Sequence, residues 1–257
     1  MAVRIRRSAA VTTATAAVAA VTLLATGCGA SAGDDDDPEH RSFALSGRTL
    51  TVDSDDSALE LVAADVDKVE VTRWFKGSVV VGGDPKVTWE MKGDTLKLRE
   101  DCSGVIADCS AKHRIEVPRG VAVTVKDGDG SVRASGFEEA LNVRTRDGSV
   151  HVKDSSGPLT LHTGDGSVTA TDVGSRRVDV NTRDGSVRLG LAAVPDRVAS
   201  RSVDGSVTIE LPRQATYRVT TETGDGSVDV SVPRDERSAH DVSARTRDGK
   251  VTVRTAN

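Results

Sequence analysis

Hydrophobic and polar residues alternate in short runs along the second half of the chain, and the runs come in pairs. Around Asp165, for example, Leu159 and Leu161 precede and Val168 and Ala170 follow, with polar residues between them. A period of two is typical of a β-strand with one buried face. An Asp-Gly step separates the two runs of each pair, which predicts two short strands joined by a tight turn.

The Asp-Gly step recurs through residues 126–257. Asp-Gly-Ser-Val occurs six times and Asp-Gly-Lys-Val once, at intervals of 18, 18, 19, 20, 21 and 23 residues. The turn residues are Asp129, Gly130, Asp147, Gly148, Asp165, Gly166, Asp184, Gly185, Asp204, Gly205, Asp225, Gly226, Asp248 and Gly249. We expect each glycine to supply a positive φ and each aspartate to accept a hydrogen bond from an N–H of its own turn. Recurrence at this length predicts a repeat architecture.

Two all-β architectures fit the repeat. In a β-solenoid each repeat forms one coil, and like residues of successive coils stack about 4.8 Å apart, which favours repetition of every position. An antiparallel β-meander or sandwich needs only good hairpins. Threonine stands two residues before the aspartate in five repeats, with Ser202 in a sixth, and a meander gives no reason for this. We therefore predict a β-solenoid of about seven regular two-strand coils over residues 126–257.

Residues 43–125 lack the Asp-Gly repeat but keep an irregular alternation, and they contain Trp74, Phe75 and Trp89. Terminal units of repeat proteins must cap an exposed end and are atypical. We predict irregular capping strands here, with the rings inside the cap. A platform on which a ligand stacks is the alternative for these rings.

The N-terminus has the pattern of a lipoprotein signal peptide. Three arginines precede an uncharged run of Ala, Val, Thr and Leu, so residues 1–27 are predicted to be a signal peptide rather than a membrane span. The sequence "ATGC" at residues 25–28 resembles the lipobox of bacterial lipoproteins. That resemblance implies a diacylglycerol on Cys28 and attachment to the outer face of the bacterial cell membrane. A plain signal peptide followed by an incidental cysteine is the alternative.

Residues 28–42 include four consecutive aspartates, and we predict that they form a solvated acidic tether. Residues 43–257 are then a single β-repeat domain. Removal of the signal peptide takes the formal net charge from −5 to −8. An acidic chain of this kind is a poor candidate for binding nucleic acid.

The remaining cysteines are Cys102 and Cys109. Outside the cytoplasm we expect them to form a structural disulfide that closes a small loop. Redox catalysis or a metal site is the alternative, but six residues between the cysteines do not match a thioredoxin-type centre.

No catalytic, cofactor or metal site emerges from the residues. The sequence contains none of the motifs of a hydrolase elbow, a zinc protease or a phosphate-binding loop. Stacked aspartates would repel one another, and we expect turn hydrogen bonds to hold them, with Arg146, Arg183 and Arg247 available to neutralise them. Calcium between the coils is the less favoured alternative, because the Gly-Gly-x-Gly-x-Asp motif of calcium-binding β-rolls is absent.

Over residues 45–257 the chain resembles the "putative adhesin" family of bacterial β-strand-repeat proteins, a domain of unknown function. The resemblance rests on "VEVTRWFKG", "VTWEMKGDTLKL", the Cys102 and Cys109 pair, "HRIEVPRGVAVTV" and the Gly-Ser-Val repeats. It implies a secreted or lipid-anchored all-β domain without established enzymatic activity, and it assigns no binding residues.

These observations favour a non-enzymatic cell-surface lipoprotein whose solenoid binds or scaffolds a glycan or protein partner. One alternative is an envelope-stress sensor that acts on a membrane partner. A polysaccharide-active β-helix enzyme is the second, and it would need paired carboxylates in a cleft.

Overall fold

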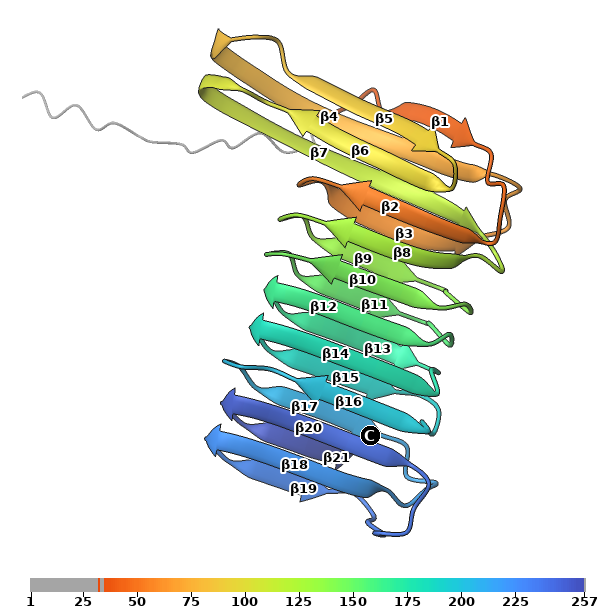
Figure 1. Cartoon of the computed structure of the whole chain (residues 1–257), viewed down its shortest axis with the longest axis vertical. Helices are drawn as coiled ribbons and strands as arrows, with labels where there is room; N and C mark the ends of the chain where they lie inside the picture. Colours follow the sequence, from red (N-terminus) through yellow and green to blue (C-terminus); the bar gives the residue numbers. More distant parts are fainter. Residues whose placement is uncertain (1–31, 33–34, 257) are drawn as a thin grey trace, which may run out of the picture.

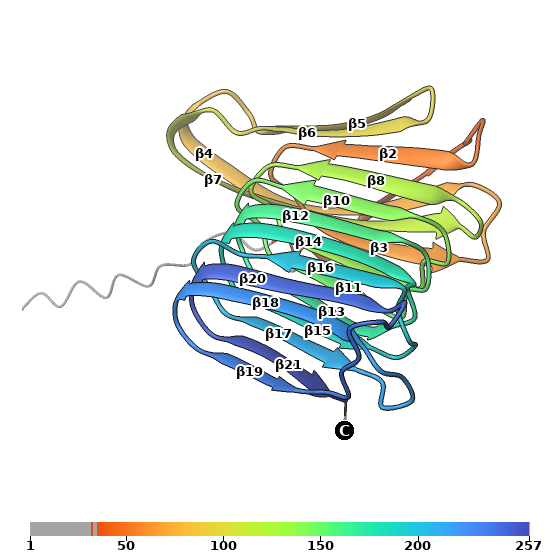
Figure 2. The ribbon, with the colours of Figure 1, turned by 60° about the horizontal axis from the view of Figure 1, so that its bottom comes forward.

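The computed structural model describes residue 32 and residues 35–256, which form two long β-sheets stacked face to face (Figures 1 and 2). The first sheet contains β1 (Glu39–Phe43), β3 (Ala58–Ala64), β4 (Val69–Gly82), β7 (Gly104–Pro118), β9 (Val132–Ser135), β11 (Val150–Lys153), β13 (Val168–Val173), β15 (Val187–Leu191), β17 (Val207–Leu211), β19 (Val228–Ser231) and β21 (Val251–Thr255). The second sheet contains β2 (Thr49–Ser54), β5 (Lys86–Lys92), β6 (Thr95–Asp101), β8 (Ala122–Asp127), β10 (Leu141–Thr145), β12 (Leu159–Asp165), β14 (Arg177–Asp184), β16 (Arg197–Arg201), β18 (Arg218–Asp225) and β20 (Asp241–Asp248). In the described part of the chain, no helix is long and apolar enough to cross a membrane.

Successive repeats pair in parallel, so the predicted β-solenoid is confirmed and the antiparallel meander is wrong. Leu141 of β10 lies opposite Leu159 of β12, and Leu159 lies opposite Val178 of β14. On the first sheet, Val150, Val168 and Val187 are in register in the same way. Each Asp-Gly turn carries the chain from one sheet to the other, and the edge formed by these turns is called the turn edge below.

The core lies between the sheets and consists mainly of valine, leucine and alanine from the alternating positions. Val143, Leu161, Val168, Ala170 and Val207 are completely buried. The side chains between them point outward and are polar, as the period of two predicts.

A ladder of hydroxyl groups explains the threonine that precedes each Asp-Gly turn. Each hydroxyl donates a hydrogen bond to a backbone carbonyl oxygen at the turn of a neighbouring coil, and all of these side chains are largely buried or half-buried. The bonds are Thr145 to Gly128 (2.8 Å), Thr163 to Gly148 (2.9 Å), Thr182 to Gly166 (3.0 Å), Ser202 to Gly185 (3.0 Å), Thr246 to Gly205 (2.8 Å) and Thr223 to Gly249 (3.1 Å). The ladder ties each coil to the next one.

The glycines of the turns are needed for close stacking and only in part for their φ angles. Among the seven, only Gly205 and Gly249 have a positive φ, at 156° and 143°, so the expectation of a positive φ at every corner was wrong. A Cβ on Gly148 would lie 1.8 Å from the carbonyl oxygen of Gly130, and one on Gly185 would lie 2.2 Å from that of Gly166. No side chain fits between turns at this spacing.

The order of the coils in space differs from their order in the sequence at both ends. β20 lies between β16 and β18, and β21 lies between β17 and β19, so the last coil of the chain is inserted before the penultimate one (Figure 1). At the other end, β2 pairs with β6 and β8, and β3 pairs with β7 and β9. The first and last coils are therefore enclosed on both sides. The edge strands of the stack are β1 and β5 at one end and β18 and β19 at the other.

The N-terminal cap starts earlier in the sequence than expected. β1 pairs antiparallel with β4, so Glu39 to Phe43 belong to the first sheet, although residues up to 42 were expected to form a solvated tether. Asp35 also contacts the domain, since its carboxylate accepts a hydrogen bond from the backbone N–H of Phe75 at 2.9 Å. Irregular antiparallel pairing is limited to β1, β4, β5, β6 and β7, whereas β2, β3 and β8 already belong to parallel coils.

Trp89 is the central side chain of this cap. It is 5% exposed and packs edge-on against Phe43, with ring centroids 6.3 Å apart. The Arg73 guanidinium lies 4.4 Å from the Trp89 ring centroid, and the completely buried His113 lies beside the same ring. Burial lowers the pKa of His113 to about 3, so the imidazole is neutral. Trp74 is half-buried on β4, where Lys112 covers its ring.

Candidate functional site

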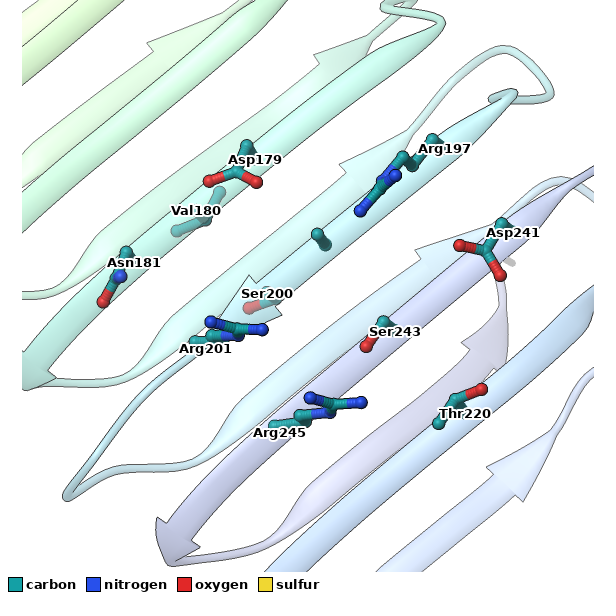
Figure 3. Close-up of a pocket in the computed structure, with 11 residues that line it drawn as sticks. Asp179, Val180, Asn181, Arg197, Ser200, Arg201, Thr220, Asp241, Ser243 and Arg245 are labelled. Atoms are coloured by element: carbon teal, nitrogen blue, oxygen red, sulfur yellow. The ribbon is translucent and has the colours of Figure 1, made fainter.

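A groove runs over the outer face of the second sheet where β14, β16, β20 and β18 lie side by side (Figure 3). Its volume is about 320 Å³. The polar residues that line it are Asp179, Asn181, Arg197, Ser200, Arg201, Thr220, Asp241, Ser243 and Arg245. Because the groove crosses four parallel strands, it exists only through the stacking of coils that are distant in sequence.

The parallel register arranges these side chains in rows. Arg197 lies opposite Asp241 and forms one wall, and Arg201 lies opposite Arg245 and forms the other. Between the walls, the small side chains of Ala199 and Ser243 form the floor. The groove is therefore a consequence of short side chains at one outward position flanked by long ones at the next.

The two walls differ in charge. Asp241 is paired with Arg218 at 3.1 Å, and Arg245 has only a longer contact of 3.4 Å with Glu222. Within residues 35–256, no carboxylate oxygen lies within 4.0 Å of a guanidinium nitrogen of Arg197 or Arg201. Figure 3 shows the guanidinium groups of Arg201 and Arg245 next to each other on β16 and β20.

Arg201 and Arg245 are part of a longer row, which we call the basic column. It contains Lys126, Arg144, His162, Asn181, Arg201 and Arg245, which are in register on consecutive strands of the second sheet from β8 to β20. Neighbouring strands are about 4.8 Å apart, so the column spans about 24 Å. Lys126 and Arg144, like Arg201, form no ion pair with a described residue.

Like charges on directly opposite positions of neighbouring strands are destabilising. Stacked cations without carboxylate partners therefore lower the stability of the fold. A bound anion would remove this repulsion. Guanidinium groups are well suited to this because they bind carboxylate, phosphate or sulfate groups through paired N–H donors. The basic column can thus bind a row of anionic groups along the solenoid axis.

The predicted turn residues lie elsewhere, along the turn edge. The carboxylates of this edge bond to arginines of a neighbouring coil: Arg146 to Asp129 at 2.9 Å, Arg183 to Asp165 at 3.4 Å and Arg247 to Asp204 at 2.7 Å. In the described residues these carboxylates accept no hydrogen bond from an N–H of their own turn, so turn capping was the wrong explanation. Neutralisation by Arg146, Arg183 and Arg247 is what the structure contains.

Asp184 and Asp225 are the turn aspartates without an arginine partner among the described residues, and Asp184 lies between two other turn aspartates. Desolvation and the neighbouring Asp204 and Asp165 raise the pKa of Asp184. The described residues contain no group of three or more His, Cys, Asp or Glu side chains that could hold a metal ion.

Asp127 occupies the ladder position of the first regular coil, since it lies opposite Thr145. It is 9% exposed, and neither carboxylate oxygen has a hydrogen bond of normal geometry. Burial raises its pKa to about 7, an effect that the nearby Ser54 hydroxyl and Gly130 N–H offset only in part. An aspartate therefore replaces the threonine where the repeat meets the cap.

The predicted cysteine sites are only partly within the described chain. Cys102 and Cys109 form a disulfide with their Cα atoms 6.3 Å apart, which links the segment between β6 and β7 to β7 itself. Cys28 lies outside the described residues.

Arg201 and Arg245 were not predicted from the sequence as site residues. The signal was available, because Arg144, Arg201 and Arg245 all stand three residues before the aspartate of their repeat.

The architecture and the groove define the class of protein: an all-β repeat protein whose parallel coils present continuous rows of polar side chains. The chain belongs to the Toastrack DUF4097 family, whose family model matches residues 30–257. This agrees with the family resemblance seen in the sequence.

Two solved structures are similar to the chain. One is a "putative cell adhesion protein" from Clostridium sporogenes, with 14% identity, a TM-score of 0.38 and coverage of 86% of this chain and 99% of that one. The other is a "putative adhesin" from Parabacteroides merdae, with 13% identity, a TM-score of 0.46 and coverage of 86% and 97%. No curated protein matches the chain. The solved relatives bear the names of adhesion proteins and not of enzymes.

Proposed function

We propose that this adhesin-like protein is a lipid-anchored cell-surface binding module, and that its ligand is an acidic glycan bound along the basic column. The observation that carries the proposal is the stacking of Arg201 on Arg245, with no carboxylate of a described residue paired with Arg201. A linear polymer with a regular row of anionic groups matches the two pairs of stacked cations in this column, Lys126 with Arg144 and Arg201 with Arg245, in each of which the strands are about 4.8 Å apart.

The overall charge of the chain makes this local arrangement more significant. The protein as a whole is acidic, with 39 Asp and Glu residues against 34 Lys and Arg residues. General electrostatic attraction therefore does not bring a polyanion to the protein, and binding requires the local basic column. The proposed activity is recognition without bond cleavage.

Binding to immobilised polygalacturonate, compared with uncharged dextran, tests the proposal. The protein is used as the full chain with Cys28→Ser, which removes the lipid attachment site. We expect selective binding to polygalacturonate that weakens as the salt concentration rises. The double variant Arg201→Ala/Arg245→Ala should bind about tenfold more weakly or worse, because two charge-assisted contacts are lost.

Arg188→Ala provides the matched control, since Arg188 is an exposed arginine on β15 of the opposite sheet without an ion pair to a described residue. It should bind as the unsubstituted chain does. Equal weakening in both variants, or equal binding to dextran, would show that the basic column is not the recognition site.

A further inference from the structure

β4 and β7 pair as an antiparallel two-stranded ribbon that projects from the solenoid, and at its outer end this ribbon bends back into the hairpin of β5 and β6. β7 pairs with β3 only from Lys112 onward, so Gly104 to Ala111 and the strand opposite them extend beyond the neighbouring coil, past the turn edge. Figure 1 shows this ribbon reaching out from the N-terminal end of the stack. The Cys102–Cys109 disulfide closes the loop of residues 103–108 at this bend, and Cys109 lies opposite Gly77.

The outer end of this ribbon, where it bends back, is apolar and exposed. Val80, Val81, Val105 and Ile106 are 69%, 63%, 64% and 73% exposed, and with the half-buried Val79 they form what we call the apolar tip. Apart from Val228 at the far end of the solenoid, these four are the exposed large hydrophobic residues of the described chain. Neither residues 77–83 nor residues 102–107 include a charged side chain, although 28% of the whole chain is charged.

The apolar side chains occupy both faces of the ribbon. Val81 lies opposite Val105 and Val79 lies opposite Ala107, so these residues share one face. Side chains alternate along a strand, so Val80 points to the other face. A ribbon that packs on a flat protein surface needs only one apolar face, whereas a segment that enters the interface of a lipid layer is surrounded on all sides.

The described residues before β2 run along the same ribbon toward the apolar tip. Glu39 lies opposite Arg73, Asp35 bonds to Phe75, and the Ala32 N–H donates to the Ser110 hydroxyl at 3.3 Å. Ser110 lies opposite Lys76, so each step toward the N-terminus moves along β4 toward the apolar tip.

Cys28 is four residues before Ala32 in the sequence, and four residues reach at most about 14 Å. From Ser110 to Val105 the strand runs about 17 Å. Four extended residues therefore cover most of the distance from Ser110 to Val105, so acyl chains on Cys28 can reach the apolar tip.

We infer that the apolar tip inserts into the lipid bilayer next to the acyl chains of Cys28 and fixes the orientation of the solenoid on the membrane. The inference rests on the proposed lipid anchor but is independent of the glycan ligand. A lipid attached to a flexible segment tethers a domain without orienting it, and a second contact supplies the orientation. The acyl chains provide the affinity, and the tip provides a fixed geometry.

Tryptophan fluorescence tests the insertion. The lipidated full chain carrying Val80→Trp is reconstituted into phosphatidylcholine vesicles, with and without brominated acyl chains, and the emission of the unsubstituted chain is subtracted. Intact mass first establishes whether Cys28 carries a diacylglycerol. We expect a blue shift on reconstitution and quenching by the brominated lipid, both retained at high salt because the contact is apolar.

Val228→Trp is the matched control, because Val228 is 45% exposed at the opposite end of the solenoid and should be neither shifted nor quenched. If Cys28 is lipidated and the Val80→Trp variant is not quenched, the inference is overturned while the anchor stands. If Cys28 carries no lipid, the proposed anchor fails. Concentration-dependent dimerisation that Val80→Ser/Ile106→Ser abolishes, without quenching, would instead identify the tip as a contact between two copies and overturn the inference.

Discussion

At Gly166 an added Cβ would lie 2.4 Å from the carbonyl oxygen of Gly148 in the neighbouring coil, far inside van der Waals contact. Gly166→Ala should therefore lower the free energy of unfolding by about 1–3 kcal/mol, the usual cost of overpacking a rigid site. Gly190→Ala on β15 is the control, because its nearest neighbour would be an ordinary 3.8 Å away. Denaturant unfolding of both variants measures the difference, and equal stabilities would contradict steric exclusion at the turn.

Asp127 gives a prediction about pH. Its pKa in the folded protein is about 7, above the ordinary 3.8, so the folded state holds a proton that the unfolded state releases. The stabilising contribution of this group is full below about pH 4 and is lost as the pH rises through 7. Asp127→Asn should thus be more stable than the unsubstituted chain at pH 8, by about 1–3 kcal/mol, and the advantage should shrink toward pH 4.

Unfolding by denaturant at several pH values measures this difference. His113 has the opposite dependence, since its pKa is lowered to about 3 and it costs stability as the pH falls below 6.5. Because both chains contain His113, its effect cancels in the comparison. A constant difference between the two chains across this range would show that Asp127 does not titrate as a buried group.

Within single coils, the strands were largely predictable from the sequence. Leu159, Leu161 and Val168 alternate with polar residues, and Thr163 repeats at the ladder position, because each coil offers the same environment as the last. The basic column was less predictable, because an arginine such as Arg201 is unremarkable until its neighbour across the strands is known. That neighbour is Arg245, which is 44 residues away in the sequence.

Glu222 is the acidic end of the row that forms the basic column, since it lies opposite Arg245 on β18. Glu222→Gln should release Arg245 and strengthen binding to polygalacturonate about two- to fivefold, as expected for the loss of one surface ion pair. Glu210→Gln, which removes the partner of Arg254 on the opposite sheet, should leave binding unchanged. Titration of both variants checks this, and no gain from Glu222→Gln would count against Arg245 as a contact.

At the scale of the whole molecule, the enclosed first and last coils could not be predicted from the repeat. The ladder chemistry is the same everywhere, so Thr223 and Thr246 can each bond to any turn glycine. The core positions show the physical reason for the order found: Val242 and Ala244 of β20 are completely buried, whereas Val219 and Thr221 of β18 are only half-buried at the open end. A threonine at an inward position is better suited to an end that meets water.

Pairs of cysteines can test this order. Thr208 lies opposite Thr252, and two rungs separate it from Asp229. A disulfide needs Cα atoms about 4.4–6.8 Å apart, so Thr208→Cys/Thr252→Cys should form one under mild oxidation. Thr208→Cys/Asp229→Cys, about 9.6 Å apart, should not. Peptide mapping under non-reducing conditions distinguishes them, and the reverse result would mean that the coils stack in sequence order.

The enclosed position of the first and last coils also limits how the length of such a protein can change during evolution. A new coil appended after residue 257 would find its neighbouring positions already taken by β16 and β18. Duplication of an internal unit, such as the 18 residues from one Asp-Gly turn at Asp147 to the next at Asp165, adds a coil between two equivalent neighbours. Family members of different length are therefore expected to differ in the middle of the array, with both termini alike.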